Sequence, residues 1–257
     1  MTRLKPHHPQ FAAHVVAWIG LAILFSSTLA SASDDRLGFA EQAVAATARE
    51  PATVIIREHI VLVWPNDLKP EWYAESQVRN VAGMADWLET AFCFSARWTR
   101  FDPNDYYARR NGENIRLIFV HNGSSDFNFG GKRPFIGLRD LKNPTAGSED
   151  WFGWLAHELS HDFWHEHPAF KRVKEVWGEG MCDYERYSLL LNMGMPNAAR
   201  RWNQALQDAQ PDDRYRGGAW MFLRFQRSHS LDGPAGLWDF LWDKDFVANL
   251  GKPQWIK

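Results

Sequence analysis

Apolar side chains recur along this chain at two different spacings, which predict two kinds of secondary structure. From Thr53 to Trp64, β-branched and apolar residues alternate with polar ones, which is typical of a strand. The shorter apolar runs at 96–101, 115–120 and 134–138 also have the length and composition of strands. Between Trp72 and Phe92, apolar residues return every three or four positions, which predicts a helix.

The second half of the chain is predominantly helical in pattern. Helical spacing around Trp151, Trp154 and Leu155 follows Ser148, which is a suitable N-cap. Beyond Lys174 the pattern predicts helices at about 175–193, 197–208, 217–229 and 234–247, with Pro196, Pro211 and Pro234 at the joints. The predicted class is therefore α+β. A small mixed sheet with helices forms one lobe (33–167), and a mainly helical lobe (168–257) follows, with an active-site cleft between them.

Composition favours a folded enzyme. The chain has 29 basic and 31 acidic residues, a formal net charge of −2 and no block of like charge, so nothing indicates nucleic-acid binding. Fourteen tryptophans are many for 257 residues. Most are expected to pack in the core or between helices, but some are expected to line a groove, which keeps glycan recognition open.

The N-terminal segment has the pattern of an export signal. A basic start precedes a largely apolar run from Val15 to Leu29, and Ala30-Ser31-Ala32 is a small-x-small cleavage site. We expect residues 1–32 to be removed, which leaves a catalytic domain at 33–257 in a secreted or periplasmic protein without stable membrane association. An uncleaved membrane anchor is the alternative, because the apolar run is near the lower length limit for spanning a bilayer.

The chain contains two cysteines, Cys93 and Cys182. In an exported protein they can form a disulfide, and that bridge would tie the helix predicted around Glu179 to the Cys93 segment. Buried free thiols are the other possibility, since unpaired cysteine is often buried. Both possibilities stay open at this point.

The motif with the clearest chemistry is His157-Glu158-x-x-His161. Residues four apart on a helix lie on the same face, so both imidazoles can point at one metal ion. Glu158 is placed beside them to accept a proton from a metal-activated water. The alternative is a surface helix with two solvated histidines. His165 and His167 follow closely, and we interpret them as structural or solvated.

A downstream carboxylate pair completes a possible metal site. Glu179 and Asp183 lie four residues apart on the next predicted helix, hence on one face. Glu179 can supply the third ligand that catalytic zinc sites need, and Asp183 can accept the free N–H of a ligating histidine. Each could instead be an ordinary exposed or salt-bridged residue. Cys182 is an improbable ligand, because it has no Cys-x-x-Cys partner.

Together, His-Glu-x-x-His and the later Glu-Gly-x-x-Asp-Tyr resemble the gluzincin zinc metallopeptidases, most closely the basic-secretory-protein peptidases of plants and bacteria. The resemblance implies a zincin-like fold and one Zn²⁺ per chain, with His157, His161 and Glu179 as ligands. It also implies that Glu158 is the general base. Tyr215 in Tyr-Arg-Gly-Gly is similar to the family tyrosine that stabilises the oxyanion, and His229 is a second candidate.

The resemblance implies a peptidase acting on peptides or proteins, with 134–138 as an edge strand that pairs with the substrate. We expect a monomer. The chain departs from the aminopeptidases of this group, because Gly137-Leu-Arg-Asp-Leu stands where their Gly-x-Met-Glu-Asn segment is expected. Endopeptidase and exopeptidase action both stay open. The alternative functions are an inactive zincin-like protein that binds glycan or protein, and a zinc hydrolase that cleaves a cell-wall cross-link.

Overall fold

The computed structural model describes residues 52–65, 78–101, 117–121, 127–128, 135–138, 148–165, 167–170, 173 and 175–250. The chain divides into two compact units, 1–46 and 47–257, and the fold described below belongs to the second. The expected export segment and the start of the helix predicted from Trp72 lie outside the described residues. Within the described residues, no helix combines the length and apolar character needed to cross a bilayer.

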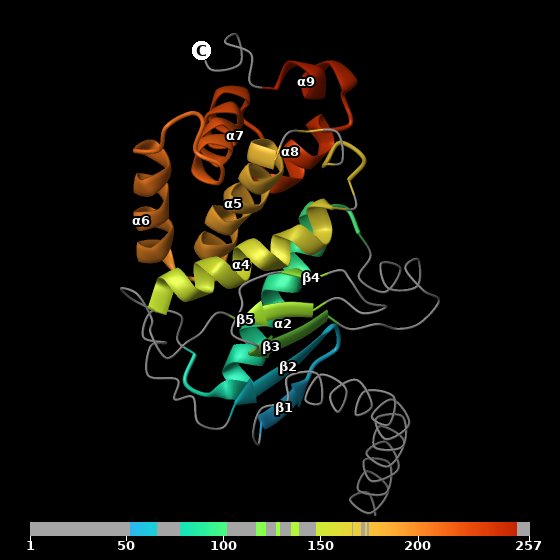
Figure 1. Ribbon diagram of the computed structural model, residues 1–257, viewed down its shortest axis with the longest axis vertical. Helices are drawn as coiled ribbons and strands as arrows, with labels where there is room; N and C mark the ends of the chain where they lie inside the picture. The colour runs from blue at the N-terminus through green and yellow to red at the C-terminus, as the bar shows by residue number, and fades with distance from the viewer. Residues whose placement is uncertain are drawn as a thin grey trace, which may run out of the picture. The chain divides into compact units, whose positions relative to one another are not determined.

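A five-stranded mixed sheet forms one side of the unit (Figure 1), with strand order β1-β2-β3-β5-β4. Its strands are β1 (Ala52–Ile56), β2 (Ile60–Pro65), β3 (Leu117–His121), β4 (Phe127–Asn128) and β5 (Phe135–Leu138). The β2–β3 and β3–β5 pairs are parallel, and the outer pairs β1–β2 and β4–β5 are antiparallel. The expected combination of a small mixed sheet with helices is confirmed.

The strand predicted over 53–64 is instead a hairpin. The turn at residues 57–59 separates β1 from β2, and the Arg57 N–H donates to the Ile60 carbonyl. The alternating pattern runs through both strands, and the turn has no Gly, Pro or Asn to mark it. The expectation of a substrate-pairing edge at 134–138 is also wrong, because β5 is paired on one side with β3 and on the other with β4.

Helix α2 (Val81–Trp98) includes residues expected to form a strand at 96–101. It begins at Asn80, whose side chain accepts a hydrogen bond from the Gly83 N–H. Ala96 continues the buried face of Leu88 and Phe92, so helical packing decides the conformation of this short ambiguous run.

The remaining helices are α4 (Ser148–Trp164), α5 (Glu175–Asn192), α6 (Pro196–Gln207), α7 (Arg216–His229), α8 (Gly233–Phe240) and α9 (Lys244–Asn249). The first four agree with the predicted positions. The single helix predicted over 234–247 is two helices, because the chain turns at 241–243 and Asp243 caps α9 through the N–H groups of Asp245 and Phe246.

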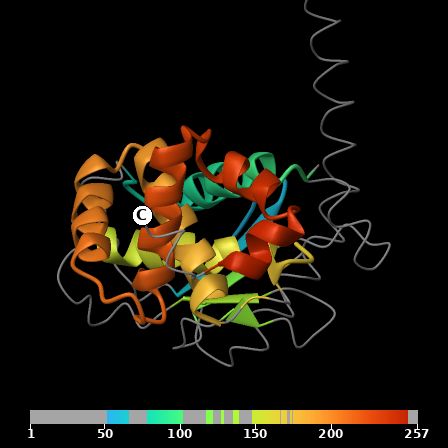
Figure 2. The ribbon, with the colours of Figure 1, turned by 90° about the horizontal axis from the view of Figure 1, so that it is seen from above.

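Helix α5 is the central element, packed on α4 and α7 and also on α6 and α8 (Figures 1 and 2). One apolar cluster joins β2, α2 and α4 to the C-terminal end of α5, and a second joins the rest of α5 to α7 and α8. The buried part of α4 is unusual, because it includes His157, Glu158, His161 and Asp162. Buried polar groups are unfavourable unless they are paired, so the partners of these side chains identify the site.

Candidate metal centre

Three side chains from α4 and α5 converge on one point. The Nε2 atoms of His157 and His161 lie 3.1 Å apart, and Oε2 of Glu179 lies 3.2 Å from the first and 3.3 Å from the second. A tetrahedral zinc ion with ligands at ~2.1 Å separates its ligand atoms by about 3.4 Å. The three atoms therefore have the spacing of three corners of such a site, and the predicted triad can hold a metal ion.

Close helix packing through glycine positions Glu179. A Cβ on Gly180 would lie 2.7 Å from the Cα of Gly218, and a Cβ on Gly218 would collide with the Val176 carbonyl oxygen. Helix α5 and the start of α7 therefore touch backbone to backbone. This approach explains the glycines in Glu-Gly and Tyr-Arg-Gly-Gly, and it brings Tyr215 to the end of α5 that carries Glu179.

The outer nitrogen of each imidazole has its own partner on α5. Nδ1 of His157 lies 2.8 Å from Oδ1 of Asp183, and both side chains are 2% exposed. Nδ1 of His161 lies 3.3 Å from Sγ of Cys182, which is fully buried. A proton on each Nδ1 leaves each Nε2 lone pair directed at the centre, which is the tautomer a metal requires. The partnership with Asp183 was predicted, whereas that with Cys182 was not.

The electrostatics of the two imidazoles differ. Burial alone would lower the pKa of His157, but Asp183, Glu179 and Glu158 together raise that pKa to about 9. Burial dominates at His161 and lowers its pKa, with neighbouring His157 acting in the same direction. Burial likewise favours a neutral Glu179, but the two histidines hold the pKa of Glu179 well below its usual range. The carboxylates around His157 therefore favour a positive charge on that side of the cluster.

Tyr215 also faces the centre. Its ring lies 5.9 Å from that of His157 and it is half-buried. Asp213 Oδ1 accepts from the backbone N–H groups of Tyr215 and Arg216, which fixes the turn before α7. Burial raises the pKa of the Tyr215 hydroxyl, Arg214 lowers it, and Glu179 and Glu158 raise it further. The hydroxyl therefore keeps its proton and is a hydrogen-bond donor at neutral pH.

His229, the other residue considered for the tyrosine's role, lies elsewhere. It ends α7, whereas Tyr215 precedes that helix, and 14 helical residues span about 20 Å. Its exposed side chain stacks on Phe225, with ring centroids 4.0 Å apart. Of the two candidates for the oxyanion role, only Tyr215 therefore lies beside the centre.

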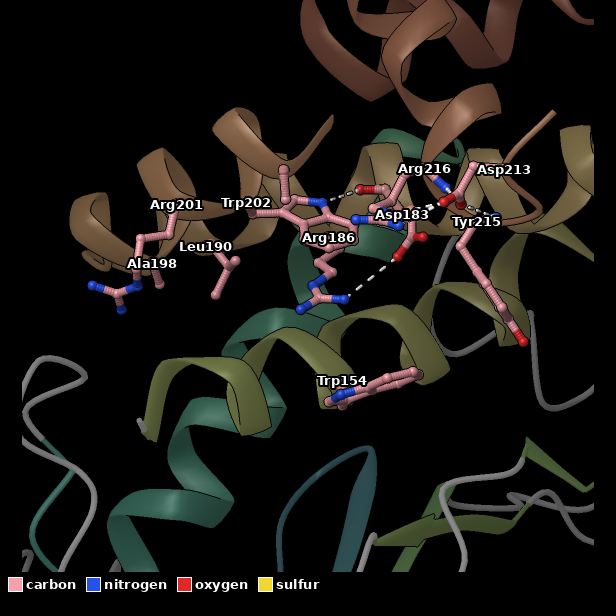
Figure 3. A pocket seen from close by; sticks show the side chains of 11 residues that line it. Trp154, Asp183, Arg186, Leu190, Ala198, Arg201, Trp202, Asp213, Tyr215 and Arg216 are labelled. Carbon is pink, nitrogen blue, oxygen red and sulfur yellow. Dashed lines mark hydrogen bonds and ion pairs between the residues drawn. The ribbon is translucent and has the colours of Figure 1, made fainter. Parts of the chain in front are cut away.

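A pocket of about 400 Å³ adjoins the centre (Figure 3). Asp183 and Tyr215 line it, together with Trp154 from α4 and Trp202 from α6. The Arg186 guanidinium lies 3.7 Å over the Trp202 ring and 3.6 Å from Oδ1 of Asp183. The described wall of the pocket thus comes from α4 and the helical lobe, with aromatic faces and buried positive charge.

Arg186 fits because α4 has a glycine opposite it. A Cβ on Gly153 would lie 2.5 Å from Nη2 of Arg186. The sequence analysis missed Arg186, although its position three residues after Asp183 is a usable signal. It also missed Arg214, whose half-exposed guanidinium lies 3.7 Å from Oε1 of Glu179.

The two histidines that follow the motif, His165 and His167, have structural roles. His167 is buried between Trp238 and Trp242, each with its ring centroid 4.5 Å away, and its Nδ1 accepts from the Ala169 N–H. His165 packs on Phe170 at 4.3 Å. Both agree with the structural interpretation. The disulfide alternative is wrong, because Cys93 and Cys182 are free thiols.

No protein-family model, curated protein sequence or solved structure matches this chain. The geometry of the site is therefore the basis on which a function can be proposed.

Proposed function

We propose that this protein is a zinc-dependent peptidase of the gluzincin type, with a zincin-like arrangement of α4 and α5. The observation that carries the proposal is the 3.1–3.3 Å triangle of two imidazole nitrogens and one carboxylate oxygen. Two histidines and a glutamate form a donor set suited to catalytic zinc, which takes three protein ligands and a water. Glu158, on the same helix as the two histidines, supplies a proton acceptor. Asp183 supplies the hydrogen-bond partner of His157.

Each side chain has a distinct role in peptide hydrolysis. A bound zinc ion supplies Lewis acidity, which polarises the scissile carbonyl and lowers the pKa of water. Glu158 accepts the proton of the attacking water and passes it to the leaving amine. The Tyr215 hydroxyl donates a hydrogen bond to the oxyanion. Removal of a single donor of this kind costs roughly 3 kcal/mol of transition-state stabilisation. Asp183 holds His157 in the ligating tautomer.

The adjoining pocket suits one side chain of a peptide or protein substrate, because Trp154 and Trp202 line it together with Asp183 and Tyr215. The export signal expected at 1–32 puts this reaction in a periplasm or the extracellular medium. The two tryptophans also favour a second candidate, recognition of a glycan or a glycan-linked peptide. Glu158 argues for hydrolysis rather than binding alone, since binding does not need a buried proton acceptor beside the ligands.

The test combines zinc content with digestion of a peptide library. We expect Glu158→Gln to keep one equivalent of zinc in this centre and lose turnover, because only the proton acceptor is removed. Glu179→Ala should lose zinc and activity together, whereas the matched control Glu175→Ala, one turn earlier at an exposed position, should retain both. Hydrolysis by Glu158→Gln, or full occupancy of this centre in Glu179→Ala, would overturn the proposal.

A further inference from the structure

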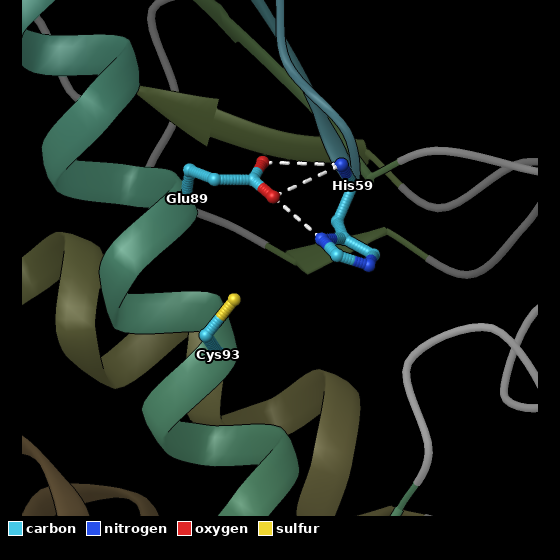
Figure 4. A group of neighbouring side chains, drawn as sticks. All are labelled: His59, Glu89 and Cys93. Carbon is cyan, nitrogen blue, oxygen red and sulfur yellow. Dashed lines mark hydrogen bonds and ion pairs between the residues drawn. The ribbon is translucent and has the colours of Figure 1, made fainter.

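A second group of metal-binding side chains lies between the β1–β2 turn and α2 (Figure 4). His59 projects from the turn, and Glu89 and Cys93 lie one helical turn apart on α2. One ligand atom from each residue lies within 4.8 Å of the other two. Imidazole, carboxylate and thiol are brought together here by two elements that are not adjacent in the sequence.

Glu89 already binds His59 through three contacts. Its Oε1 lies 2.5 Å from Nδ1 of the ring, and both carboxylate oxygens accept from the His59 backbone N–H, at 3.1 and 3.2 Å. The His59 side chain is 9% exposed and its ring stacks on that of Phe92, with ring centroids 5.1 Å apart. Two of the three side chains are therefore side by side before any ion binds, which reduces the entropy lost on binding, and coordination replaces the Nδ1–Oε1 hydrogen bond with bonds to the ion.

The charges around Cys93 favour a cation. Burial raises the pKa of the Cys93 thiol, Glu89 and Glu58 raise it further, and Arg97 opposes them. A bound divalent ion would lower the pKa of the thiol instead, because it offsets the carboxylate charge and stabilises the thiolate. Cys93 is only half-buried, so an ion can reach it from solvent. Loading releases the thiol proton to solvent.

We propose that His59, Glu89 and Cys93 bind a divalent transition-metal ion of the zinc class, separate from the centre on α4 and α5. A thiolate and an imidazole select borderline-soft ions such as Zn²⁺ and Co²⁺ over Mg²⁺ and Ca²⁺. None of the three residues lines the pocket beside Tyr215. The ion therefore cross-links the β1–β2 turn to α2 and stabilises the sheet lobe, and hydrolysis does not require it.

Cobalt distinguishes the two centres, because only a thiolate ligand gives a strong near-ultraviolet charge-transfer band. The probe is Co²⁺ added in excess to reduced, metal-free protein. We expect the band in the unmodified chain and in the control Cys182→Ser, and its loss in Cys93→Ser. Zinc content should fall from two equivalents to one in Cys93→Ser while peptidase activity is retained.

A second pair of variants tests the carboxylate ligand. Glu89→Gln should weaken cobalt binding at the thiolate site by about tenfold or more, because an anionic ligand is lost. Asp86→Asn, at a 65% exposed position on the same helix, removes the 2.6 Å ion pair that holds Arg57 of the same turn, and it should weaken cobalt binding much less than Glu89→Gln does. A folded, reduced chain with no charge-transfer band would overturn the proposal, and so would a band that survives Cys93→Ser. A band lost only in Cys182→Ser would instead assign the thiolate to the other centre.

Discussion

Asp183→Asn is the most informative substitution in the site, because it changes charge while nearly preserving shape. The Asp183 carboxylate accepts from Nδ1 of His157 at 2.8 Å and lies 3.6 Å from the Arg186 guanidinium. An asparagine oxygen can still accept from Nδ1, so the orientation of the ring is kept. What is lost is the negative charge that makes His157 a stronger metal ligand.

The expected loss of zinc affinity is about 10- to 100-fold, the usual effect of removing a charged hydrogen-bond partner from a ligating histidine. This corresponds to about 1.4–2.7 kcal/mol. The fold should also lose stability, because Arg186 is 6% exposed and would lose the charge of the Asp183 carboxylate beside it. Breaking a buried ion pair costs about 3–5 kcal/mol, and the loss here should be smaller because the guanidinium stays stacked on Trp202.

The assay is competition for zinc against a chromophoric chelator, with thermal melting measured in parallel. Arg186→Gln is the matched control, because it removes the same ion pair and leaves the Asp183–His157 hydrogen bond intact. It should lower the melting temperature without weakening zinc binding at the first centre. The reasoning fails if Asp183→Asn binds zinc there as tightly as the unmodified chain, or if Arg186→Gln weakens zinc binding equally.

Three further predictions concern the neighbours of the centre. Tyr215→Phe should lower kcat by about 100-fold with unchanged zinc content, and an unchanged kcat would remove the hydroxyl from the mechanism. Gly218→Ala should lower both melting temperature and activity, because its Cβ collides with the Val176 carbonyl. The control Gly83→Ala should lower neither, because the nearest atom to its Cβ outside the neighbouring backbone is 3.5 Å away. Equal effects of the two substitutions would refute the packing argument. Burial raises the pKa of Glu185 from 4.5 to about 7, so the folded state holds the proton more tightly and stability is lost as pH rises through this window. The free energy of unfolding of Glu185→Gln, relative to the unmodified chain, should therefore be roughly 3 kcal/mol higher at pH 8 than at pH 4 in denaturant titrations. The same difference between the two proteins at both pH values would contradict a raised pKa for Glu185.

The metal triad could be predicted from the sequence because its information is local. His157 and His161 are one turn apart on a helix that begins at Ser148, as the pattern indicated, and Glu179 and Asp183 repeat that spacing on α5. Helical periodicity alone fixes which of these side chains share a face. The periodicity does not show that the two helices pack against each other. That packing was assumed because two histidines and a glutamate are typical ligands of zinc.

The features that sequence analysis missed depend on contacts between distant segments. Cys182 lies against His161 only because α5 crosses α4 at a particular rotation. The hairpin turn before Ile60 has no turn-forming residue, yet the strands on either side pair with each other. Residues 96–98 of α2, which were predicted to begin a strand, are helical because Ala96 packs in the core. In each case tertiary packing decides a local choice that propensity leaves open.

Helix α5 explains why so many functional contacts come from one short segment. It is buried on nearly every side from Trp177 to Arg186, so polar residues pointing in different directions all need partners. Asp183 meets His157, Cys182 meets His161, and Glu185 meets Ser95 on α2. Because these partners lie on different elements, a change in the metal centre also changes packing against the neighbouring helices. Activity and stability should therefore vary together for substitutions at Asp183, and separately for substitutions at Glu158 or Tyr215.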